Sequence, residues 1–191
     1  MLLNFKVKNF RSIKEEINLD LQATSDTTHK SQAVFEKGNV ALLKSAAIYG
    51  PNASGKSNIL KAFVVFRKTI LESLLRSITT AELPSECFKL SSATEKEPSF
   101  FEMTFLLGSE VFCYGFEMDK KKVCSEWLRQ EKGNKTLFKR EDQNIESNKN
   151  YFKEATAVLK RQTTERVLFL TVLASNNGKI SNKIIQFIIV K

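Results

Sequence analysis

The segment from Gly50 to Ser57 places the tightest limit on the fold of this chain. Its residues, Gly-Pro-Asn-Ala-Ser-Gly-Lys-Ser, fit the pattern G-x-x-x-x-G-K-[ST] without a mismatch. The apolar run Ala46–Tyr49 before it predicts a buried strand, and apolar residues at helical spacing follow it. Strand, glycine-rich loop and helix in this order predict a phosphate-binding P-loop. The alternative is a glycine-rich turn that happens to precede a helix.

Each part of this loop has a predicted role. Gly50 and Gly55 let the backbone bend tightly and approach a phosphate chain. The successive backbone N–H groups and the positive end of the helix dipole then face the anion. We expect Lys56 to reach the β- and γ-phosphate oxygens and the Ser57 hydroxyl to bind Mg²⁺. The predicted nucleotide-binding residues of the loop are Gly50, Pro51, Asn52, Ala53, Ser54, Gly55, Lys56 and Ser57.

Composition limits the class of protein. With 191 residues, of which 42% are hydrophobic, the chain can bury a core and is not a disordered protein. Cys87, Cys113 and Cys124 include no C-x-x-C pair, which argues against a disulfide framework or a zinc site. Residues 1–10 alternate in polarity, unlike a signal peptide, and the apolar stretch Ile184–Val190 is too short to span a bilayer. We therefore expect a cytoplasmic protein that does not enter a membrane.

The chain carries a formal net charge of +9, from 30 Lys and Arg against 21 Asp and Glu. Such an excess can attract nucleic acid through contacts with phosphates. It is equally consistent with a solvated basic surface, or with a basic lobe whose acidic complement lies on another segment. The lysines are spread along the chain, so charge alone does not decide among these interpretations.

Periodicity predicts an α/β fold with an antiparallel part. Leu3, Phe5 and Val7 alternate with polar residues, and so does the segment Ile17–Leu21, which predicts a β-hairpin that turns at Asn9–Ser12. Polar residues at 24–32 predict a loop, and Val40–Leu43 predicts a strand. The division we expect is a P-loop core with its hairpin at 1–78, a linker at 79–99, an antiparallel β-meander at 100–140 and a helical segment at 141–191.

Finer boundaries follow from the same patterns. The P-loop helix should run to about Arg76. Turn signals divide the meander into strands at 100–107, 111–118, 123–131 and 136–140. The polar stretch 141–150 is expected to be exposed, and helices are expected at 151–161, 164–175 and 180–190.

Several features of a complete nucleotide hydrolase are missing from the sequence. No apolar strand ends in the Asp that would help to hold Mg²⁺. The guanine-reading motif N-K-x-D is absent, since Asn134-Lys135 is followed by Thr136-Leu137, which favours ATP over GTP. The single histidine, His29, has no partner base nearby in the sequence, and we interpret it as an exposed bystander. No catalytic residue can be identified.

The order of these parts resembles a known group of proteins. A hairpin that begins at residue 1 carries Asn9-Phe10-Arg11-Ser12, and the loop Gly50–Asn58 follows about forty residues later. This resembles the N-terminal lobe of the SMC/RecF-like ABC-type ATPases. More narrowly, it is similar to bacterial AAA-type ATP-binding proteins, several of which are linked to abortive infection and phage defence. The resemblance covers most of this chain and about half of a family member.

The resemblance implies further roles. It implies that Arg11 approaches the nucleotide from the hairpin, although a solvated turn residue is an equal alternative, and that Asn52 and Asn58 shape the loop. It also implies that Walker B, the signature helix and the switch histidine lie in a C-terminal half, with ATP closed between two protomers.

On this interpretation, hydrolysis by these residues alone is very slow and needs a homodimer or a chain that carries the other half. Phage defence and DNA repair are the processes that the resemblance suggests. The alternative is a module that binds nucleic acid or a partner under nucleotide control without turnover. A small-molecule kinase is a weaker interpretation, because a hairpin precedes the loop and the meander lacks strand–helix alternation.

Overall fold

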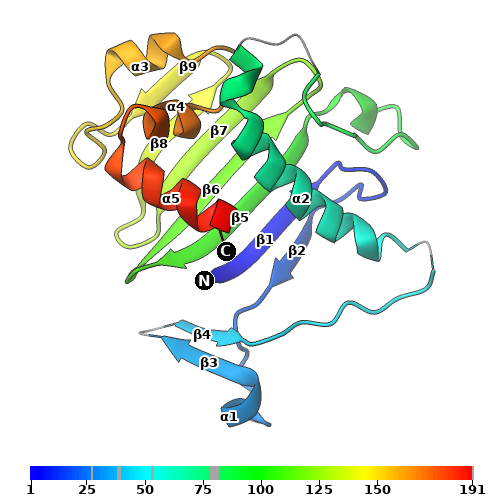
Figure 1. Ribbon diagram of the computed structural model, residues 1–191. Coiled ribbons are helices and arrows are strands. Elements are labelled where there is room, and N and C mark those ends of the chain that lie inside the picture. Colours follow the sequence, from blue (N-terminus) through cyan, green and yellow to red (C-terminus); the bar gives the residue numbers. More distant parts are fainter. Residues whose placement is uncertain (27, 38–39, 53, 78–81, 191) are drawn as a thin grey trace.

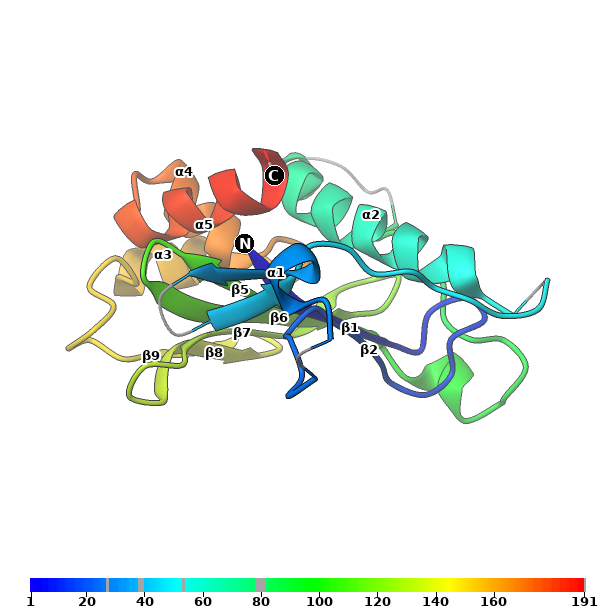
Figure 2. The ribbon, with the colours of Figure 1, turned by 90° about the horizontal axis from the view of Figure 1, so that it is seen from below.

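A single antiparallel sheet forms the centre of the molecule. The computed structural model describes residues 1–26, 28–37, 40–52, 54–77 and 82–190. In it, seven strands lie in the order β2-β1-β5-β6-β7-β8-β9, and helices α2, α4 and α5 cover one face of the sheet (Figures 1 and 2). The strands are β1 Leu2–Lys8, β2 Ile17–Asp20, β3 Val34–Lys37, β4 Val40–Leu43, β5 Ser99–Leu107, β6 Glu110–Met118, β7 Val123–Gln130, β8 Lys135–Glu141 and β9 Asn144–Ser147.

The helices follow the same chain order. The long helix α2 and the C-terminal α5 are the two that carry most of the apolar cover. Short 3₁₀ turns occupy Leu74–Ser77 and Thr94–Lys96. The helices are α1 Lys30–Ala33, α2 Lys56–Glu72, α3 Ala157–Gln162, α4 Phe169–Ser175 and α5 Lys179–Val190. Within the described residues, no helix is both long and apolar enough to cross a bilayer.

The core lies between the sheet and these helices. Alternate residues of β5 and β6 point toward the helices because side chains in a strand alternate between its two faces. Phe66 of α2 is fully buried among them, with its ring stacked on Phe116 at 5.2 Å and edge-on to Phe5 at 5.7 Å. One continuous cluster therefore joins α2 to strands from both ends of the sheet.

Strands that the sequence analysis placed in separate segments share this sheet. β1 pairs with β5 in antiparallel register, for example Phe5 with Met103 and Val7 with Phe101. The predicted hairpin of β1 and β2 is confirmed, with Phe5 opposite Leu19. The four predicted meander strands are confirmed as β5 to β8. The fold is thus a mixed α/β structure in which every strand pairing of the described residues is antiparallel.

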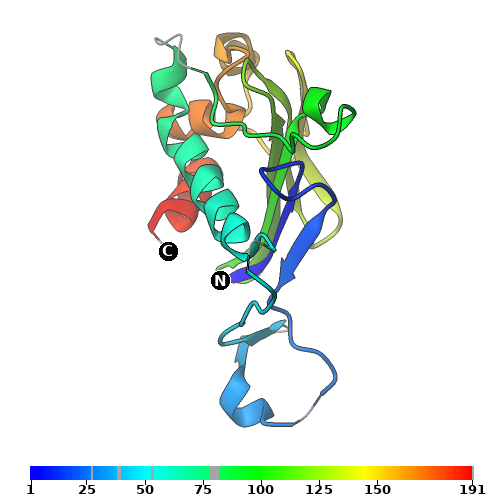
Figure 3. The ribbon, with the colours of Figure 1, turned by 90° about the vertical axis from the view of Figure 1, so that its right-hand side faces the viewer.

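A second, smaller hairpin projects from the sheet. Strands β3 and β4 pair only with each other, apart from a bridge between Leu42 and Gln22 (Figures 1 and 3). Leu42 is buried with Leu3 and Leu106 in a small cluster at the base of this hairpin. The predicted strand at 40–43 is confirmed as β4. The loop expected at 24–32 is shorter than predicted, because α1 begins at Lys30 and β3 follows it directly.

The predicted strand before the P-loop is wrong. Residues 46–49 have no strand conformation, and the Tyr49 side chain is 90% exposed. A strand needs hydrogen-bonding neighbours, and no described strand runs beside this segment. Its apolar residues therefore lie at the surface.

Four boundaries also differ from the prediction. α2 ends at Glu72, and a 3₁₀ turn replaces its last residues. The polar stretch 141–150 contains β9, which buries Ile145 against the core and so is not wholly exposed. Helices α3 and α4 start about five residues later than predicted, because residues 151–156 and 164–168 form turns and extended backbone. α5 is confirmed.

Candidate functional site

The glycine-rich loop leads directly into α2. Gly55 has a φ of 92°, in the left-handed region that favours glycine, and it caps the N-terminus of the 17-residue helix. The first turn of α2 contains Lys56, Ser57 and Asn58 and no acidic residue. Because the first N–H groups of a helix lack intrahelical acceptors, those of Lys56 and Ser57 can bind an anion there, whereas the Asn58 N–H already donates to Gly55 O at 2.8 Å. Ala53 lies outside the described residues.

The lysine of the loop folds back onto the loop itself. Lys56 Nζ donates to the carbonyl oxygens of Gly50 at 2.7 Å and Pro51 at 2.5 Å. The Ser54 N–H also donates to Pro51 O, at 3.3 Å. These contacts hold the ammonium group against the first residues of the loop.

The turn of the β1–β2 hairpin packs against this loop. The Asn58 side-chain amide donates to Ser12 Oγ at 2.7 Å. A Cβ at Gly55 would meet the same oxygen at 2.7 Å, so only glycine fits there without a shift of Ser12. The hairpin turn is therefore a wall of the site, although 43 residues separate Ser12 from Gly55 in the sequence.

The side chain of Asn9 anchors this turn to the segment before β5. This side chain is fully buried, donates to the carbonyl oxygens of Thr94 at 2.7 Å and Glu97 at 2.8 Å, and accepts from the N–H of Phe88 at 2.8 Å. Phe10, which follows it, is also fully buried in the core. The turn is thus anchored to the segment before β5 and is not a free loop.

Arg11 is engaged by an acidic residue of that segment. Its guanidinium lies 2.6 Å from the Glu86 carboxylate, and its backbone N–H donates to Glu86 O at 2.6 Å. Arg11 is the neighbour of Ser12, but it does not line the hollow beside the loop. The interpretation of Arg11 as a nucleotide contact stays a prediction.

A hollow of about 310 Å³ lies where these elements meet. It is lined by Ser12, Asn52, Ser54, Gly55, Lys56, Ser57 and Asn58. The structure therefore brings most of the predicted loop residues together around one space, and it adds Ser12. The donors present are hydroxyls, amides and an ammonium group, which suit an anion such as a phosphate chain.

The residues around this hollow offer fewer ligands for a metal ion than donors for a phosphate chain. Ser57 offers one hydroxyl ligand, and in the described part of the chain no cluster of three or more His, Cys, Asp or Glu side chains is suited to hold a metal. Mg²⁺ usually binds through a few protein oxygens together with substrate phosphates. The residues thus fit a magnesium ion that binds together with a nucleotide, with Ser57 as one ligand and with phosphate oxygens and water as the others.

Contacts at the far end of α2 fix its direction. The N–H of Leu168, at the start of α4, donates to Ser73 Oγ at 2.7 Å, and the Thr171 hydroxyl lies 2.9 Å from the same oxygen. Arg67, in the middle of α2, donates to the carbonyl oxygen of Ile189 in α5. The axis of α2, and with it the direction of its dipole, is held by two neighbouring helices.

A buried ion pair holds α4 in turn. Glu126 and Arg140 are both fully buried, 3.7 Å apart, and the Glu126 carboxylate accepts from the N–H groups of Phe169 at 2.6 Å and Leu170 at 2.9 Å. Burial raises the pKa of Glu126 above its usual range, while Arg140 and these donors oppose the shift. The sequence analysis predicts a role for neither residue, because the strand of Glu126 also contains the polar residues Ser125, Arg129 and Gln130 and so does not mark it as buried.

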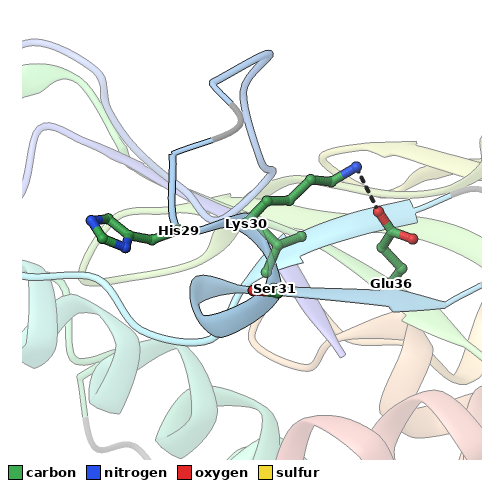
Figure 4. A pocket seen from close by; sticks show the side chains of 5 residues that line it. His29, Lys30, Ser31 and Glu36 are labelled. Carbon is green, nitrogen blue, oxygen red and sulfur yellow. Dashed lines mark ion pairs between the residues drawn. The ribbon is translucent and has the colours of Figure 1, made fainter.

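A separate hollow of about 640 Å³ is lined by residues of α1 and β3 and by His29 (Figure 4). Lys30 and Glu36 form an ion pair across it at 2.9 Å, and His29 points away from that pair. An imidazole without a carboxylate or nucleophile beside it has no catalytic partner. The His29 side chain is also exposed. The hollow beside the P-loop is therefore the stronger candidate site.

Comparison with protein families agrees with this choice. Residues 45–188 match the family described as "AAA domain, putative AbiEii toxin, Type IV TA system". A comparison with curated proteins gave no match. The family match begins just before the P-loop and covers well over half of the chain. This chain therefore belongs to that AAA-domain family, a family of P-loop ATPases.

Proposed function

We propose that this chain binds Mg-ATP, with the phosphates at the N-terminus of α2. The observation that carries the proposal is the left-handed Gly55 directly before a long helix that starts with Lys56 and Ser57. Phosphate oxygens there would accept from the unpaired N–H groups of the first turn. The family match supports a nucleotide as the source of these phosphates.

Lys56 would change partners when the nucleotide binds. Its ammonium now donates to two neutral carbonyls, of Gly50 and Pro51. An anionic phosphate oxygen is a stronger acceptor than a carbonyl oxygen, because the hydrogen bond is then charged on both sides. The movement is a side-chain rotation, so the loop backbone can keep its shape.

The test is Mg-ATP binding by isothermal titration calorimetry and thermal shift, with wild type, Lys56→Ala and Lys61→Ala. Lys61 is an exposed lysine of the same helix that does not line the hollow, so its variant controls for the loss of charge. We expect wild type and Lys61→Ala to bind alike. Saturation at about 100 times the dissociation constant should add about 2.7 kcal/mol of stability.

We expect Lys56→Ala to bind ATP much more weakly and to show no shift at the same concentration. Equal loss in both variants would mean that only general charge matters. No binding by wild type would contradict the proposal.

Hydrolysis, in this proposal, needs residues from a second copy or from a chain that carries the other half of an SMC/RecF-like ATPase. The outer face of α2 supports an assembly, since Leu60, Val64 and Leu71 are 54–63% exposed on it. We expect ATP turnover by this chain alone to equal that of Lys56→Ala. Turnover well above that control in a monomeric sample would refute this part.

We place the protein in abortive infection, on the strength of the family's description as a toxin of a type IV toxin–antitoxin system. The test of this role compares the growth rates of bacteria that express wild type and of bacteria that express Lys56→Ala. Wild type should arrest growth and Lys56→Ala should not. Equal growth of both would contradict a nucleotide-dependent toxic role.

The net charge of +9 supports one alternative, a nucleotide-gated module that binds nucleic acid. Its signature is DNA or RNA affinity that changes with ATP and falls steeply with salt. Fluorescence anisotropy at two salt concentrations, with and without Mg-ATP, separates it from the ATPase lobe.

A further inference from the structure

The turn between β1 and β2 offers a hydroxyl donor to the P-loop hollow. Ser12 Oγ accepts a hydrogen bond from Asn58 Nδ2 at 2.7 Å. A serine hydroxyl also has one hydrogen of its own to donate. In the part of the chain that the structure describes, this hydrogen has no acceptor, and the Ser12 side chain is exposed to the hollow.

The hydroxyl is held in place before any ligand arrives. Phe10, two residues earlier in the chain, is fully buried, and the Asn9 side chain is bonded to four residues of the segment before β5. The Asn58 amide sets the direction of the Ser12 oxygen from the helix side. A donor that is already ordered binds a ligand without a further loss of conformational entropy.

We propose that Ser12 is a phosphate-binding residue, which donates its hydroxyl hydrogen to an oxygen of the bound phosphate chain. The hairpin turn and the P-loop then both contact the phosphates. This inference rests on the proposed function, because it assumes that a nucleotide occupies the hollow. It assigns Ser12 a contact that the loop motif does not include.

The size of the effect follows from the chemistry. A neutral hydroxyl that donates to an anionic phosphate makes a charge-assisted bond, and its loss weakens binding about tenfold or more. The loss should be the same for ATP and for inorganic tripolyphosphate, since the contact involves the phosphates alone.

The experiment measures Mg-ATP and Mg-tripolyphosphate binding by titration calorimetry. The variants are Ser12→Ala, Ser12→Thr, Ser12→Cys, Asn58→Ala and the double variant Ser12→Ala/Asn58→Ala. We expect Ser12→Ala and Ser12→Cys to bind both ligands about tenfold more weakly, because a thiol is a poor donor. Ser12→Thr keeps the hydroxyl and should bind within threefold of wild type. Thermal unfolding without ligand checks that each variant folds.

Asn58→Ala separates a direct contact from a supporting one. It removes the bond between Asn58 and Ser12 but leaves the hydroxyl, so it should lose less affinity than Ser12→Ala. If Ser12→Ala, Asn58→Ala and the double variant all bind equally weakly, the hydroxyl only holds Asn58 and the inference is wrong. If Ser12→Ala binds like wild type, the inference is wrong while the proposed function stands. If wild type binds neither ligand, both are wrong.

Discussion

At the scale of single residues, Gly55 connects the sequence motif to the shape of the site. Its φ of 92° and the closeness of Ser12 Oγ both exclude a side chain. Gly108 offers a matched control, because it has a φ of 66° but nothing lies within 4 Å of its missing Cβ. The two glycines thus share a left-handed backbone conformation that strains any residue with a Cβ, and they differ in crowding.

We expect Gly55→Ala to destabilise the fold by more than Gly108→Ala, which should cost about 1–2 kcal/mol from backbone strain alone. Gly55→Ala should also lose Mg-ATP binding, since Ser12 or the loop must move. Urea unfolding and titration calorimetry measure the two effects. A Gly55→Ala protein that binds ATP like Gly108→Ala would show that the contact with Ser12 can relax at no cost.

Glu126 is a second residue whose role depends on its surroundings. We expect Glu126→Gln to lower the free energy of unfolding by about 1–3 kcal/mol at neutral pH, because its NH₂ group cannot accept from the buried N–H of Phe169 or Leu170 as a carboxylate oxygen does. Glu141→Gln, on the exposed side of β8, is the control and should change stability by less than about 0.5 kcal/mol. Equal small effects would mean that these two N–H groups find other acceptors when the amide replaces the carboxylate.

The raised pKa of Glu126 gives this residue a signature in pH. A carboxyl whose pKa is higher in the folded state favours folding most when it is protonated. Its contribution is complete below the ordinary pKa and is lost as the pH rises through the raised one. Urea unfolding from pH 4.5 upward should therefore show a steeper decline in wild type than in Glu126→Gln, in which Glu154, whose pKa is also raised by burial, still contributes. Parallel curves would contradict the raised pKa.

At the scale of elements, α2 has two faces with different roles. Its inner face carries Phe66, which is fully buried, and its outer face carries Val64, which is 61% exposed. Because the core cluster includes α2, loss of an inner side chain should loosen the helix that carries the P-loop.

We expect Phe66→Ala to cost about 3–5 kcal/mol, as a large core aromatic does, and to weaken ATP binding as well. Val64→Ala, two residues away on the outer face, should cost little in the isolated chain. Urea unfolding compares the two variants. Similar losses would indicate that the outer face is covered by another copy under the conditions used.

At the scale of the whole molecule, the expected division at 1–78, 79–99, 100–140 and 141–191 stays a prediction. The sheet nevertheless contains strands from the first, third and fourth of these segments, and one core cluster contains residues from all four. The single tryptophan, Trp127, lies on β7 and donates to Glu102 at 2.8 Å, so its fluorescence reports on the sheet.

We expect one cooperative unfolding transition, because the helices and the sheet share that core. Trp127 fluorescence reports on the sheet, and circular dichroism at about 222 nm reports on the helices, so the two curves should coincide in urea. Mg-ATP should move both by the same amount. Separate midpoints would instead show that the segments unfold as independent domains.

Much of the architecture can be read from local patterns. Alternation of apolar residues predicted the hairpin, turn signals predicted the meander, and helical spacing predicted α2, because these signals depend only on near neighbours. The same holds for the P-loop motif, because its glycines and its lysine all lie within eight consecutive residues. Helix starts at 157 and 169 were missed, since the turns before them are held by contacts with distant segments.

The sequence by itself determined that a loop of P-loop type opens a long amphipathic helix and that an antiparallel meander follows it. Only the tertiary structure decided that β1 lies beside β5, that Ser12 faces Gly55, and that Glu126 meets Arg140. It also decided that residues 46–49 form no strand, because a strand exists only where a neighbour pairs with it. Such contacts join residues far apart in the chain, and no local pattern encodes them.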